Sequence, residues 1–146
     1  MLACDIPHSA ALRTSLRPLR MLKVPIRFVT YNIRNGHNGG LEVALWGMSQ
    51  ANMDLGILQE TKLTYGIYTP GSAGYSVVAT DAPSRHRGGV AIFYRSEPHF
   101  VVEAVEKFGP HVIGFQLVTG TRQWYIVGVY IAPDETETME RVIKAI

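Results

Sequence analysis

Hydrophobic residues in this chain recur mainly in short runs of strand length, separated by segments rich in glycine and polar residues. The first run covers Ile26–Tyr31, and another covers Leu55–Leu58. Between them, apolar residues recur at every third or fourth position over 41–52. Short apolar runs predict strands, whereas this wider spacing predicts an amphipathic helix. We therefore expect the folded domain to begin with a strand, a loop, a helix and a second strand.

Strands are expected to dominate the rest of the chain. After an irregular stretch over 65–74, β-branched and aromatic residues are concentrated in further strand-like segments. These segments are Tyr75–Ala79, Gly89–Tyr94, Phe100–Val105, Val112–Val118 and Gln123–Ile131. The polar segment 119–122 predicts a turn that joins the last two in an antiparallel hairpin. A final apolar stripe predicts that a helix begins within 135–146.

The composition fits one packed domain and argues against wholesale disorder. The chain has 146 residues, of which 47% are hydrophobic and 18% are charged. A membrane-spanning helix needs about 20 consecutive apolar residues, and no run in the sequence approaches that length. The only cysteine is Cys4, which excludes an internal disulfide and fits a reducing, intracellular compartment. The net charge of +2 does not by itself indicate nucleic-acid binding, which depends on where charges cluster.

The first 23 residues differ from the rest of the chain. They contain four basic residues against one acidic residue, they include two prolines, and they lack a sustained hydrophobic period. A segment of this composition does not bury enough apolar surface to fold by itself. We therefore expect residues 1–23 to be a basic, disordered leader and residues 24–146 to form the domain.

Two oxygen-bearing side chains are expected at the ends of predicted strands. Glu60 follows the apolar run Leu55–Leu58 closely, and Asn32 follows Ile26–Tyr31 directly. Strand ends are a usual place for site residues on an α/β scaffold. Carboxylate and amide oxygens are ligands that Mg²⁺ prefers. If the two strands are neighbours, the sequence predicts a magnesium site formed by Glu60 and Asn32.

Four segments resemble motifs of the endonuclease/exonuclease/phosphatase superfamily, which has the DNase I-like fold. In chain order, they are Phe28–Asn32, Asp54–Lys62, Arg87–Tyr94 and Val127–Pro133. Within the superfamily, the chain is most similar to the endonuclease domains of LINE-type retrotransposons. The resemblance covers about residues 24–146, and it covers only the first half of the family's domain.

The resemblance implies an α+β fold class, a DNase I-like α/β sandwich. The chain would supply only the first half of it, one mostly antiparallel or mixed β-sheet with flanking helices, truncated before the second half. A two-sheet fold that is cut between its sheets exposes an apolar sheet face. We therefore expect homo-association through that face.

The resemblance also implies magnesium-dependent phosphodiester hydrolysis, with Mn²⁺ as an alternative ion. Glu60 would be a metal ligand, and Asn32 would bind the metal or orient the scissile phosphate. Tyr130 occupies the position at which the family has a phosphate-contacting tyrosine, whose phenol could stabilise developing charge. The catalytic candidates are therefore Asn32, Glu60 and Tyr130.

Four basic residues are candidates for substrate binding. Arg34 and Lys62 lie beside the proposed ligands, and Arg85 and Arg87 lie in a short loop next to paired glycines. Such positive charges can contact a phosphate backbone. The alternative is that they are ordinary solvated charges, which are common in loops.

Other parts of the family's active site have no counterpart in this sequence. The Asp-x-Asn motif, a later aspartate and a closing Asp-His pair are absent. In the family these groups activate water and stabilise the leaving oxygen. We interpret His37, His86, His99 and His111 as loop or strand-surface residues. The sequence therefore shows half of an active site, and we do not expect independent catalysis.

Three functions remain open at this point. The first is a portion of a DNA endonuclease of retroelement type, which would act in the nucleus. The second is a phosphatase or phosphodiesterase of the same superfamily that acts on a lipid or a small phosphoester. The third is a catalytically inactive, truncated remnant or binding module.

Overall fold

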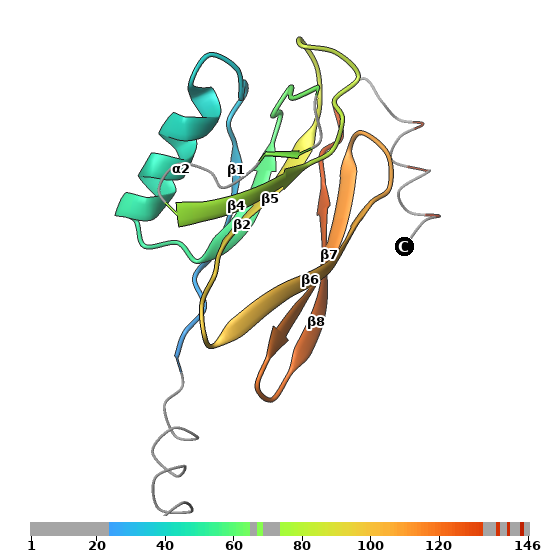
Figure 1. The fold of residues 1–146 in the computed structure, drawn as a ribbon. Helices are drawn as coiled ribbons and strands as arrows, with labels where there is room; N and C mark the ends of the chain where they lie inside the picture. Colours follow the sequence, from blue (N-terminus) through green and yellow to red (C-terminus); the bar gives the residue numbers. More distant parts are fainter. Residues whose placement is uncertain are drawn as a thin grey trace, which may run out of the picture.

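The computed structural model describes residues 24–64, 67–68 and 74–132, together with the single positions 137, 140 and 144. The expected leader 1–23 lies outside the described residues, as does most of the expected helix 135–146. The described chain forms two β-sheets and one long helix (Figure 1).

The larger sheet has five strands in the spatial order β1-β2-β5-β4-β3. Their bounds are β1 (Phe28–Asn32), β2 (Leu55–Gln59), β3 (Ile67–Tyr68), β4 (Tyr75–Ala79) and β5 (Val90–Arg95). Helix α2 (Gly40–Gln50) connects β1 to β2, so these two strands run parallel, and the other pairs are antiparallel. In this register Asn32 lies opposite Gln59. The ends of β1 and β2 therefore lie next to each other, as the predicted metal site requires.

The smaller sheet has three antiparallel strands in the order β6-β7-β8. Their bounds are β6 (Phe100–Lys107), β7 (Val112–Thr119) and β8 (Gln123–Val129). A change of register between Glu103 and Glu106 marks a β-bulge in β6. The predicted hairpin is formed by β7 and β8.

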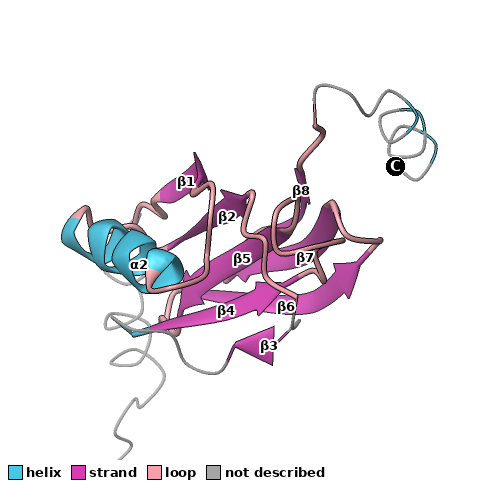
Figure 2. Ribbon diagram, turned by 90° about the horizontal axis from the view of Figure 1, so that it is seen from above, coloured by secondary structure: helices cyan, strands magenta, loops and turns pink. Residues whose placement is uncertain are grey.

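The hydrophobic core lies on both faces of the larger sheet. On one face, Leu41 and Leu45 of α2 pack with residues such as Leu58. On the other face, residues of the larger sheet such as Ile57 pack with residues of the smaller sheet such as Ile113. Helix α2 and the smaller sheet thus cover opposite faces of the larger sheet (Figures 1 and 2). Each large side chain buried this way contributes about 1.5–3 kcal/mol.

The expected α+β class with mixed strands is confirmed, and most predicted element bounds agree within two residues. The strands, however, form two sheets rather than one. The inner faces of the two sheets cover each other, so the exposed inner face expected from a single sheet is not found in the described chain. The stretch expected to be irregular over 65–74 contains the short strand β3. Among the described residues, no helix has both the length and the apolar character needed to cross a membrane.

Candidate active site

The centre of the candidate site is a hydrogen bond between the two sheets. Glu60 directly follows β2 of the larger sheet, and Tyr130 directly follows β8 of the smaller sheet. The Tyr130 hydroxyl donates to Glu60 Oε1. Both side chains are half-buried, so water competes only in part for this charge-assisted bond. The two candidates, 70 residues apart in the chain, therefore meet in the fold.

Asn32 completes the set of strand-end candidates. It is the last residue of β1 and pairs in register with Gln59, the residue before Glu60. Its Oδ1 accepts a hydrogen bond of 2.9 Å from the backbone N–H of Arg34, which fixes the amide group locally. An amide oxygen has two lone pairs, so one remains for a ligand. Asn32 is exposed, and its side chain can be reached from solvent.

Three residues around the site have left-handed backbone conformations. Glu60 has φ 52°, Lys62 has φ 55° and Arg34 has φ 59°. Such values are uncommon outside glycine and cost on the order of 1–3 kcal/mol each unless the surroundings fix them. Strain of this kind concentrates at functional sites. The backbone around Glu60 is thus held in a conformation that its residue types do not favour.

Hydrogen bonds from two neighbouring segments hold the Glu60 segment in place. The N–H groups of Thr61 and Lys62 donate to the carbonyls of Gly89 and Gly88, over 3.2 and 2.9 Å. From the other side, the N–H of Gly36 donates to Thr61 O over 2.8 Å. These bonds join the β1–α2 loop, the end of β2 and the start of β5 at one edge of the sheet.

His37 adds a side-chain bond to this arrangement. Its Nε2 lies 2.5 Å from Lys62 O, and since a carbonyl can only accept, Nε2 is the donor. Its backbone N–H donates to Asn35 Oδ1 over 3.0 Å. His37 is a loop residue, as expected, and it also fastens that loop to the segment that carries Glu60. No sequence signal indicated this second role.

His111 lies in the turn before β7, as the loop interpretation expected, but it is buried rather than on the surface. It is only 6% exposed, and its carbonyl accepts a 3.0 Å hydrogen bond from Tyr130 N. The two rings lie 6.2 Å apart. A Cβ at Gly88, which has φ 71°, would lie 2.4 Å from His111 Cε1. Glycine at this position thus gives His111 room, and the paired glycines before β5 were the only signal of this packing in the sequence.

The structure brings the basic candidates together only in part. The bond from Lys62 N to Gly88 O places Lys62 beside the segment that begins with Arg87. Arg87 closes a tight turn with Ser84, and Arg85 lies within that turn. Arg34, Arg85 and Arg87 are exposed, whereas Lys62 is half-buried.

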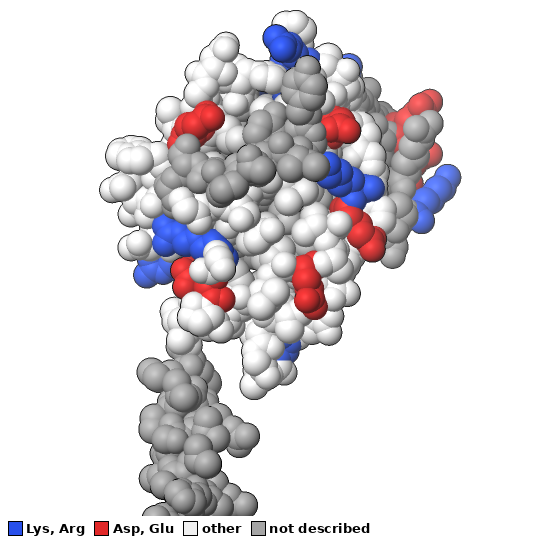
Figure 3. Space-filling model, viewed as in Figure 1, with Lys and Arg blue, Asp and Glu red and all other residues white. Residues whose placement is uncertain are grey.

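The electrostatic field of the site is local. On the face shown in Figure 3, basic and acidic side chains are interspersed and form no large patch of one sign. Any contribution to phosphate binding would come from direct contacts and would weaken with salt.

The donor set limits the kind of metal site that these residues can form. No group of three or more His, Cys, Asp or Glu side chains converges within the described part of the chain. The hard donors at the strand ends are the Glu60 carboxylate and the Asn32 amide oxygen. Tyr130 bonds only one carboxylate oxygen, which leaves Oε2 for a ligand. Such a set fits Mg²⁺, which keeps several waters and shares substrate phosphate as a ligand.

Two packed sheets with α2 outside form part of a DNase I-like fold, as two solved structures show. The chain is similar to the endonuclease domain of TRAS1, a telomere-specific non-LTR retrotransposon, with a TM-score of 0.63 and 15% identity. It is also similar to an AP endonuclease from Archaeoglobus fulgidus, with a TM-score of 0.55 and 17% identity.

These similarities extend over most of this chain but only part of the solved structures. The first covers 84% of this chain and 54% of the TRAS1 chain, and the second covers 83% and 49%. The chain thus spans about half the length of both solved structures. No family model and no curated protein matches the sequence.

Proposed function

We propose that this chain is the first half of a metal-dependent phosphodiester hydrolase, a DNA endonuclease of the retroelement type. The observation that carries the proposal is the Tyr130–Glu60 hydrogen bond at the end of β2, beside Asn32 on β1. Both solved structures described above are endonucleases, and each shares the fold at low sequence identity. The fold supports a nuclease, and the site residues support the role of a divalent metal in it.

Each candidate residue has a defined part in this proposal. Glu60 and Asn32 would hold Mg²⁺, or Mn²⁺ in its place, and the ion would supply positive charge to a phosphate oxygen. Tyr130 orients the Glu60 carboxylate through its hydroxyl, and it can donate to a phosphate only when this single proton turns away from Glu60. Arg34, Lys62, Arg85 and Arg87 make salt-sensitive contacts with the DNA backbone.

The same geometry explains why nicking by this chain alone is not expected. Hydrolysis also requires a group that takes a proton from the attacking water. Glu60 has no proton-accepting group to spare, because it accepts from Tyr130 and is assigned to the metal, and no group of three or more His, Cys, Asp or Glu side chains converges within the described residues. The proposal therefore assigns water activation to a group other than Glu60, Asn32 and Tyr130.

Titration with Mn²⁺, followed by electron paramagnetic resonance, tests the metal site directly. Glu60→Gln keeps the shape and an acceptor for Tyr130 but removes the charge. We expect it to weaken Mn²⁺ binding at least about tenfold. Glu42→Gln is the matched control, because Glu42 is an exposed carboxylate on α2. Equal affinity of the wild type and Glu60→Gln would refute the assigned metal site.

Substrate class is tested in parallel with three probes. Supercoiled plasmid DNA, vesicles containing a phosphoinositide, and p-nitrophenyl phosphate are incubated with the chain in Mg²⁺ or chelator. Binding of DNA that weakens with salt, together with Mn²⁺ binding at Glu60, supports the nuclease assignment. Binding or turnover of the lipid or the small ester instead would contradict it. Binding of neither metal nor DNA would favour an inactive remnant.

A further inference from the structure

The backbone of Thr61 and Lys62, directly after Glu60, is hydrogen-bonded at every polar group. Its two N–H groups donate to the carbonyls of the paired glycines before β5. Its two carbonyls are bonded by the loop between β1 and α2, through Gly36 N–H at 2.8 Å and His37 Nε2 at 2.5 Å. Three of these four bonds join backbone to backbone, and the fourth comes from a side chain. A substitution of His37 therefore removes one support of the Glu60 segment and leaves the other three.

This support acts where sheet pairing has ended. The register of β1 with β2 ends at Asn32 and Gln59, so Glu60 is the first residue beyond it. Glu60 and Lys62 both have left-handed backbone conformations, with φ 52° and 55°. Conformations of this kind persist only when the surrounding structure fixes them. The bond from His37 to Lys62 O is therefore one of the contacts that hold the backbone from which the Glu60 carboxylate projects.

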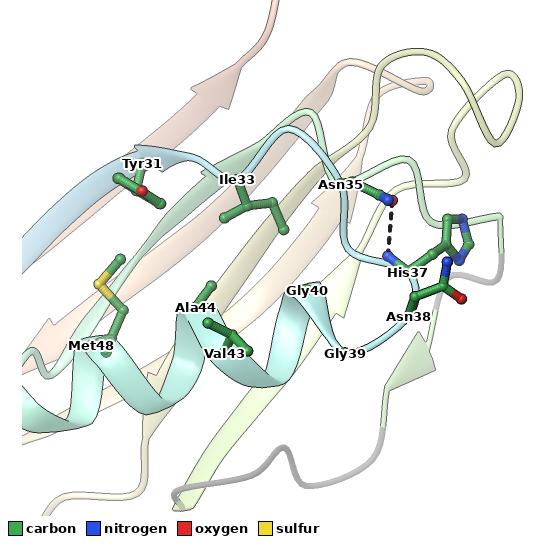
Figure 4. Close-up of a pocket in the computed structure, with 11 residues that line it drawn as sticks. Tyr31, Ile33, Asn35, His37, Asn38, Gly39, Gly40, Val43, Ala44 and Met48 are labelled. Atoms are coloured by element: carbon green, nitrogen blue, oxygen red, sulfur yellow. Dashed lines mark hydrogen bonds between the residues drawn. The ribbon is translucent and has the colours of Figure 1, made fainter.

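The His37 donor is itself held in place on both sides. Its N–H donates to Asn35 Oδ1 over 3.0 Å, the bond drawn in Figure 4. Its carbonyl accepts a 3.0 Å bond from the N–H of Gly40, the first residue of α2. The side chain is half-buried, so water competes only in part for its bond to Lys62. His37 is thus a preorganised donor that is fixed by the loop and by the start of the helix.

The same loop also holds the second proposed metal ligand. Asn32 Oδ1 accepts its 2.9 Å bond from the N–H of Arg34, two residues after β1. Arg34 has a left-handed backbone conformation as well, with φ 59°. The loop therefore contacts Asn32 at its start and the Glu60 segment at His37. One short segment of chain links the two oxygen donors, in addition to the pairing of β1 with β2.

We propose that His37 is a positioning residue for the metal site, which keeps the Glu60 carboxylate beside Asn32. The inference rests on the metal-binding role proposed for these two residues. The described bonds of His37 go to Lys62, Asn35 and Gly40, so it acts on the ligands through the backbone. Groups that orient metal ligands contribute strongly to metal affinity, although they do not touch the ion.

Three variants separate this role from a general contribution to folding. His37→Ala removes the donor, whereas His37→Gln keeps an amide N–H at about the reach of Nε2. Tyr75→Phe is the matched control, because the Tyr75 hydroxyl also donates to a backbone carbonyl, that of Met53, over 2.5 Å. Met53 lies before β2, at the end of the strand opposite Glu60. His37→Ala and Tyr75→Phe thus each remove one bond from a side chain to the backbone, and only the first adjoins the proposed site.

Titration with Mn²⁺, followed by electron paramagnetic resonance, measures the effect on the metal site. We expect His37→Ala to weaken Mn²⁺ binding about fivefold, less than the loss of a residue that bonds a metal ligand directly. His37→Gln should bind nearly as tightly as the wild type, and Tyr75→Phe should bind equally tightly. Wild-type affinity in His37→Ala would overturn the proposal. An equal loss in His37→Ala and either of the other two variants would also overturn it.

Hydrogen exchange in the absence of metal gives a second readout. The amides of Thr61 and Lys62 should exchange faster in His37→Ala than in the wild type, and at nearly the wild-type rate in His37→Gln. Unchanged exchange in His37→Ala would overturn the proposal, because the bond would not be holding this backbone.

Failure of the proposed function has a different signature. Equal Mn²⁺ affinity of the wild type and Glu60→Gln would refute the metal site, and the positioning role of His37 would fall with it. Weaker binding in Glu60→Gln, together with wild-type affinity in His37→Ala, would refute the positioning role alone.

Discussion

Replacing Tyr130 by phenylalanine removes one hydroxyl and leaves the ring that lies beside His111. The lost group is the donor to Glu60 Oε1. A hydrogen bond to a charged group contributes about 1.5–3 kcal/mol when it is well shielded from water. Because both side chains are only half-buried, we expect a coupling between them of about 1 kcal/mol.

A double-mutant cycle measures this coupling separately from the other contacts of Tyr130. It compares the wild type, Tyr130→Phe, Glu60→Ala and the double variant by urea unfolding at pH 7. The coupling is the difference between the effect of the double change and the sum of the two single effects. The reasoning predicts that Tyr130→Phe is destabilising with Glu60 present and nearly neutral without it. A coupling below about 0.3 kcal/mol would mean that the bond does not form in solution, and the candidate site would lose its central contact.

Two further predictions concern the core. A Cβ at Gly56 would lie 2.2 Å from Val29 O, so Gly56→Ala should separate β1 from β2 and destabilise the chain by about 3 kcal/mol in urea unfolding. Gly47→Ala, on α2 where an added Cβ would meet no neighbouring atom within 4 Å, should instead stabilise by about 0.5–1 kcal/mol, and a loss in both would refute the steric explanation. Burial raises the pKa of Tyr75 above its ordinary value of 10.0, against an opposing effect of Arg95. The Tyr75 phenol therefore ionises in the unfolded chain first, and the free energy of unfolding should fall as pH rises above about 10. The decrease with pH should be smaller in Tyr75→Phe. An equal decrease in both proteins would contradict the raised pKa of Tyr75.

The sequence predicted the elements better than their arrangement. Strand and helix positions follow from local periodicity, which is why β4 begins and ends at the expected residues. Local periodicity does not say which strands share a sheet. The nearly continuous apolar run of β7, for example, fits one large sheet as well as a second sheet packed over Ile57. The division into two sheets depends on contacts between distant segments, which the sequence alone does not reveal.

In the candidate site, too, local features of the sequence were predicted, and contacts between distant segments were not. Glu60 and Asn32 were identified because each lies at the end of an apolar run, a local feature, and Tyr130 was identified through the resemblance of Val127–Pro133 to a family motif. His111 precedes an apolar strand and resembles many surface histidines in sequence. Its burial arises from the room left by Gly88, which comes from another part of the chain. Supporting residues of this kind are identified only when the segments are placed in space.

The candidate site depends on the packing between the sheets more than on either sheet alone. Glu60 belongs to one sheet and Tyr130 to the other, so their contact requires the sheets to lie at a fixed separation. Gly128 of β8 sets that separation locally, because a Cβ there would lie 2.9 Å from the Ile57 side chain of β2. Gly128 is two positions from Tyr130, and Ile57 is three positions from Glu60. A larger residue at position 128 would thus move Tyr130 away from Glu60 without touching either.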